Sequence, residues 1–91
     1  MNEQDIIQYN KNVATIKICL DVVASKLLKR EDPARIEKIV KGIEHLILKC
    51  YNMNPGPEKK DELTKMHEIN LSIFDLLKIA KSYGWELLEF E

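Results

Sequence analysis

Two histidines and two cysteines are the side chains of this sequence best suited to bind a metal ion or act as a base. His45 and His67 each follow or precede a glutamate, Glu44 and Glu68. Neighbouring positions on a helix point about 100° apart, so neither pair places two ligands on one face. The spacings that do so, His-x-x-x-His and Glu-x-x-His, do not occur. The sequence therefore predicts no metal site and no cofactor.

Nucleophilic catalysis needs a nucleophile, a base and a group that orients the base. Cys19 and Cys50 fall on or beside apolar stripes, where burial raises the pKa of a thiol and leaves it inert. The three serines, Ser25, Ser72 and Ser82, lie within helical patterns, with no strained turn to present their hydroxyls. We therefore expect no catalytic residue and no enzyme.

The elements that position these residues are three stretches with helical spacing of apolar residues. The first, over about residues 5–29, carries the apolar seam Ile6, Tyr9, Val13, Ile16, Leu20, Val23 and Leu27. An alternative is a strand over 16–22, where apolar and polar residues alternate with period two. The strand explains seven residues and the helical spacing explains the whole stretch, so the sequence favours a helix.

Two further helices are predicted at 33–51 and 58–83. Asp32 and Pro33 form a helix start, and residues 52–57 contain breakers between the two helices. Gly84 is a stop signal after the third helix. The buried stripes expected are Ile36, Ile39, Val40, Ile43, Leu46, Ile47 and Cys50, then Leu63, Met66, Ile69, Ile73, Leu76, Leu77 and Ala80.

These patterns predict an all-α fold, a small antiparallel three-helix bundle in one domain over 1–91. A short helix in the tail at 84–91 would add a fourth element. No apolar run approaches the length of a membrane-spanning helix, and the first residues are polar and acidic, unlike a secretory signal. We expect a cytoplasmic protein with reduced thiols and no membrane partner.

Apolar residues beyond the predicted stripes indicate an interface. They are Leu71, Phe74, Ile79, Trp85, Leu87, Leu88 and Phe90. Large apolar patches are seldom left in water, so the sequence predicts contact with a protein partner or with itself, the latter as a homodimer. The alternative is that the tail folds back and covers this surface.

A basic stretch follows the end of the first helix. Its patch is Lys26, Lys29, Arg30, Arg35 and Lys38, continued by Lys41. Residues 26–41 hold six basic and three acidic side chains, a net charge of +3. This patch fits an anion or an acidic partner, or else an ordinary solvated helix end. The net charge of −1 and the lack of base-reading residues argue against a nucleic-acid partner.

The function expected is a small cytoplasmic, non-catalytic interaction protein, an adaptor or regulator that acts through the bundle surface. One alternative is a sensor of a small anionic ligand. Another is an inhibitor or immunity-type protein of bacterial or phage origin. In size, helix pattern and the Asn54-Pro55-Gly56-Pro57 linker, the chain resembles the small helical-bundle immunity proteins of lactic-acid-bacterium bacteriocins. That resemblance assigns no functional residue.

Overall fold

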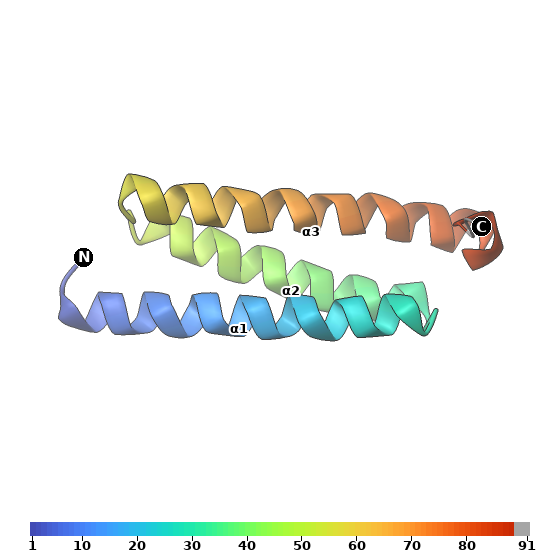
Figure 1. The fold of residues 1–91 in the computed structure, drawn as a ribbon, viewed down its shortest axis with the longest axis horizontal. Coiled ribbons are helices and arrows are strands. Elements are labelled where there is room, and N and C mark those ends of the chain that lie inside the picture. The colour runs from blue at the N-terminus through green and yellow to red at the C-terminus, as the bar shows by residue number, and fades with distance from the viewer. Residues whose placement is uncertain (89–91) are drawn as a thin grey trace.

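The computed structural model describes residues 1–88, the last two by their backbone only, as three long helices and a final turn. These are α1 (Glu3–Leu28), α2 (Pro33–Asn52), α3 (Pro57–Tyr83) and the 3-10 turn η1 (Trp85–Leu88). The helices alternate in direction, so α1 and α3 run the same way along a body of 48 × 20 × 18 Å (Figure 1). The all-α three-helix fold is confirmed, and the alternative of a strand over 16–22 is wrong.

Local capping signals explain where the helices begin. Asn2 accepts a hydrogen bond from the Asp5 amide at 2.8 Å, and the Asp5 side chain accepts one from the Asn2 amide at 3.4 Å. This reciprocal cap starts α1 two residues before the predicted start. Asp32 caps α2 by accepting from the Ala34 amide at 3.0 Å, with Pro33 in the first helical position.

The core lies along the inner faces of all three helices. Its members among the described residues are Tyr9, Val13, Ile16, Val23, Ile36, Val40, Ile43, Ile47, Cys50, Leu63, Met66, Leu77 and Ala80. Every one of these was predicted from the apolar stripes. The other predicted core residues are half-buried at its edges, with two exceptions on α1 and α3.

Those two exceptions are Ile6 and Ile69, which are 40% and 52% exposed. Ile6 lies in the first turn of α1, and this turn extends beyond the start of α3 (Figure 1). On α3 the inward positions advance in steps of three and four through Leu63, Met66 and Asn70, and Asn70 is only 2% exposed. The buried place predicted for Ile69 is therefore taken by its polar neighbour.

The end of α3 folds back onto the rest of the bundle. Gly84 has a φ of +82°, a conformation that favours glycine, and its amide donates to the Ala80 carbonyl at 2.8 Å. The reversal brings Trp85 to the connection between α1 and α2, where its indole Nε1 donates to the Glu31 carbonyl at 3.0 Å. Trp85 is half-buried against the core, whereas Leu71 and Ile79 of the predicted apolar surface are exposed.

Candidate binding site between α2 and α3

A hollow of about 290 Å³ lies between the outer faces of α2 and α3. Its lining residues are Lys41, Glu44, His45, Leu48, Asn70, Leu71 and Phe74. Leu48 and Leu71 are 50% and 48% exposed, and Phe74 is half-buried against the core. Three apolar side chains from two helices therefore meet at one accessible surface.

Polar contacts between the two helices form the inner side of this hollow. Glu44 on α2 reaches His67 on α3, whose Nδ1 lies 3.0 Å from Oε1 and 3.1 Å from Oε2. Asn70 donates through Nδ2 to Glu44 Oε2 at 3.2 Å and to the Val40 carbonyl at 3.1 Å. These contacts join α2 to α3 at two residues of the lining, Glu44 and Asn70.

The orientation of the Asn70 amide is fixed by its neighbours. Both hydrogens of Nδ2 point to acceptors, the Val40 carbonyl and the Glu44 carboxylate, so the reversed amide would set an oxygen against two oxygens. The Oδ1 atom is buried and has no hydrogen-bond donor among the described residues. A buried acceptor without a donor costs about 1–3 kcal/mol, which makes this atom the least satisfied polar group of the site.

One lysine, Lys41, lines the hollow, and Lys78 contacts its Phe74. Lys78 Nζ lies 5.5 Å from the centroid of the Phe74 ring, a cation–π distance. Lys41 Nζ lies 3.3 Å from Glu37 Oε1, and Lys81 Nζ lies 3.0 Å from Oε2 of the same carboxylate. The hydrogen bond from Lys81, with a smaller one from Lys41, lowers the pKa of Glu37. The Glu37 carboxylate thus contacts two ammonium groups, one from α2 and one from α3.

The structure divides the predicted interface residues among several places. Leu71 and Phe74 line the hollow, whereas Ile79, 39% exposed, lies about 80° around α3 from Leu71. Trp85 packs at the α1–α2 connection. The side chains of Leu87 and Leu88, and all of Phe90, lie outside the described residues.

The basic patch spreads over the end of α1, the connection and the first turns of α2. Lys26 Nζ lies 3.3 Å from Glu31 Oε1, and Arg35 Nε lies 4.0 Å from Asp32 Oδ2. The other three members, Lys29, Arg30 and Lys38, are exposed. Of the wider basic stretch only Lys41 lines either hollow described here.

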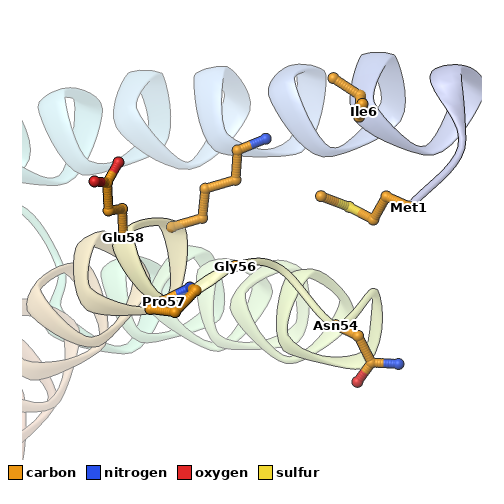
Figure 2. A pocket seen from close by; sticks show the side chains of 7 residues that line it. Met1, Ile6, Asn54, Gly56, Pro57 and Glu58 are labelled. Carbon is orange, nitrogen blue, oxygen red and sulfur yellow. The ribbon is translucent and has the colours of Figure 1, made fainter.

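A second and wider hollow, about 530 Å³, lies where the chain begins. It is bounded by the first turn of α1 and the connection between α2 and α3, and Figure 2 shows Met1 and Ile6 across from Pro57 and Glu58. Asn54, Gly56 and Lys59 complete its lining. No buried polar side chain faces this space among the described residues, so it offers less for specific binding than the hollow between α2 and α3.

The histidines and cysteines lie in separate places in the bundle. Among residues 1–88 no group of three His, Cys, Asp or Glu side chains could hold a metal ion. His45 is exposed on the rim of the α2–α3 hollow and His67 is held by Glu44. Cys50 is buried, and burial raises the pKa of its thiol, while Cys19 is half-buried.

Sequence reasoning missed Asn70, Glu44 and Leu48 as parts of one site. The signal for Asn70 was present, because it continues the three-and-four spacing of the α3 core positions.

No helix in the described part of the chain is long and apolar enough to cross a membrane. Comparison with protein-family models, with curated proteins and with solved structures finds no match for this chain.

Proposed function

We propose that this chain is a small cytoplasmic interaction protein without catalytic activity, which binds a protein partner through the outer face of α2 and α3. The observation that carries the proposal is the meeting of Leu48, Leu71 and Phe74 around the hollow. Exposed apolar residues gathered on two helices, with a polar rim, are typical of a protein-binding surface.

The open shape of the hollow favours a partner's side chain over an enclosed free ligand. Pockets for small molecules enclose roughly 300–1,000 Å³ and bury most of the ligand. At about 290 Å³ and open to solvent on one side, this hollow fits one bulky side chain. Such a side chain, seated in a pocket at the centre of an interface, commonly supplies much of the binding energy.

The partner can be a second copy of the chain, and we propose a homodimer as the first case to test. Leu71 and Phe74 are the members of the predicted self-association surface that line the hollow. Sedimentation of the purified protein over a concentration series measures this directly. A monomer at every concentration would leave a different protein as the partner.

Site-specific photo-crosslinking in the cells that make the protein tests the interaction itself. A photoreactive residue at Leu71 should give one discrete adduct, because this position borders the hollow. The matched control is Ser72, which is exposed but lies about 100° further around α3. An adduct of twice the chain's mass would identify the homodimer. If Leu71 gives no adduct, or the same set as Ser72, this face is not the binding surface.

A further inference from the structure

We propose that the face of α2 and α3 binds a second copy of this chain about a two-fold axis parallel to the helices, so that α2 of each copy lies over α3 of the other. The inference rests on the proposed function and specifies the homodimer that it names as the first case to test. It is drawn from the separation of basic and acidic side chains on the two sides of the hollow.

Lysines follow the outer side of α2 and form a basic edge, Lys38, Lys41 and Lys49, all of them exposed. Lys41 and Lys38 lie about 20° and 80° around α2 from Leu48, on the side opposite Glu44, which reaches toward α3. Lys38 and Lys49 form no ion pair within the described part of the chain. Two positive charges of this edge are therefore available to a partner.

Carboxylates follow the outer side of α3 and form an acidic edge, Glu68 and Asp75, both exposed. They lie about 60° and 40° around α3 from Leu71, on the side opposite Phe74. Neither carboxylate forms an ion pair with another described residue. Lys78 is set apart from them, over the Phe74 ring. The hollow thus lies between an edge of each sign.

The two edges match in height along the bundle. Asn70 Nδ2 donates to the Val40 carbonyl at 3.1 Å, so these two residues of the antiparallel helices lie level. Counted from them at about 1.5 Å per residue, Lys38 lies within about one helical turn of the height of Asp75. A two-fold axis parallel to the helices preserves height and exchanges the edges. Lys38 of each copy therefore meets Asp75 of the other.

Charge distinguishes this arrangement from the alternatives. An axis across the helices would lay α2 over α2 and set the two basic edges against each other, which is unfavourable. A partner with charge of one sign would be repelled by one of the edges, whereas a second copy presents both. The apolar residues of both copies then meet at the centre of a self-complementary interface, where their burial supplies the affinity; they are Leu48, Leu71 and Phe74.

Two charge reversals test the arrangement when they are mixed. Lys38→Glu and Asp75→Lys each set like charges together in their own homodimer, which should dissociate about ten-fold more readily at low ionic strength. In a heterodimer of the two variants both contacts are again between opposite charges. Native mass spectrometry of the mixture should therefore show the heterodimer well above its statistical share of about half of all dimers.

The matched controls are Lys11→Glu and Asp21→Lys, which make the same charge changes at exposed positions of α1. Their mixture should give the statistical share. The same statistical result for the Lys38 and Asp75 variants would overturn the arrangement. A Lys38→Glu homodimer tighter than that of the unaltered chain would also overturn it, since relief of repulsion is the result expected for an axis across the helices.

The two proposals fail in distinguishable ways. An adduct of twice the chain's mass at Leu71, with no preference for the heterodimer, would keep the binding face and reject the arrangement. A monomer at every concentration would reject this inference, and an adduct of Leu71 with another protein would still support the proposed function. If Leu71 and Ser72 give the same adducts, the proposed face is rejected and the arrangement with it.

Discussion

Replacement of Asn70 by leucine should stabilise the protein, although the change removes two hydrogen bonds. Asn70 is 2% exposed in the core between α2 and α3, and its Oδ1 has no donor among the described residues. Leucine has no polar atom at this place. In this variant the Val40 carbonyl keeps its hydrogen bond within α2, and Glu44 keeps its contact with His67.

The magnitude follows from three contributions. Removing the unpaired acceptor recovers about 1–3 kcal/mol. Burying a leucine side chain contributes about 1.5–3 kcal/mol more. Loss of the Nδ2 hydrogen bond to the Val40 carbonyl opposes this by about 0.5–1.5 kcal/mol, and loss of the one to the Glu44 carboxylate by about 1.5–3 kcal/mol. At the midpoints of these ranges, the net gain in the free energy of unfolding is about 1 kcal/mol.

Urea denaturation measures this gain as a higher midpoint with an unchanged slope. Ile69→Ala is the companion variant, because Ile69 is 52% exposed and should cost less than about 1 kcal/mol. The opposite core register, with Ile69 inside, would make that cost about 2–5 kcal/mol. A destabilised Asn70→Leu together with a severe Ile69→Ala would refute the placement of Asn70 in the core.

Three further expectations concern titration and reactivity. Burial raises the pKa of Tyr9 from 10.0 to about 12. Its contribution to the free energy of unfolding is therefore complete below pH 10.0 and declines as pH rises through about 12. The alkaline unfolding curve of Tyr9→Phe should lack this decline. The pKa of Glu37 is lowered mainly by the hydrogen bond from Lys81, so this carboxylate stabilises the fold above pH 4.5 and loses that effect as pH falls further. Acid unfolding of Glu37→Gln should lack this loss of stability. Iodoacetamide should modify Cys50 only after unfolding, whereas half-buried Cys19 should react sooner. Equal rates in the native protein would contradict the burial of Cys50.

Local signals account for the parts of the fold that the sequence predicted well. The cap at Asp32 and the stop at Gly84 act through the backbone groups next to them. The start of α2 and the end of α3 can therefore be predicted without the tertiary structure. The start of α1 was predicted two residues late because Asn2 and Asp5 cap each other reciprocally. Each of these features depends on residues close together in the chain.

The candidate site could not be predicted in the same way, because it depends on how two helices face each other. Reading the apolar pattern alone placed Ile69 in the core and passed over Asn70. Leu71 and Ile79 both appeared as surplus apolar residues, and only the rotation of α3 against α2 assigns Leu71 to the hollow. Leu48 joins it from a helix 23 positions earlier in the chain, a contact that no local spacing encodes.

Because the bundle has an odd number of helices, its resistance to force depends on the direction of pulling. The chain reverses twice, so its first residues and the end of α3 lie at opposite poles of a body 48 Å long (Figure 1). Tension between these poles draws α1 and α3 in opposite directions along their axes, and both must slide past α2. Sliding strains the contacts along a helix together, whereas peeling breaks them one after another. We therefore expect the bundle to resist pulling at these poles more strongly than pulling across two adjacent helix ends, a difference in forced unfolding rate that a force spectrometer can measure.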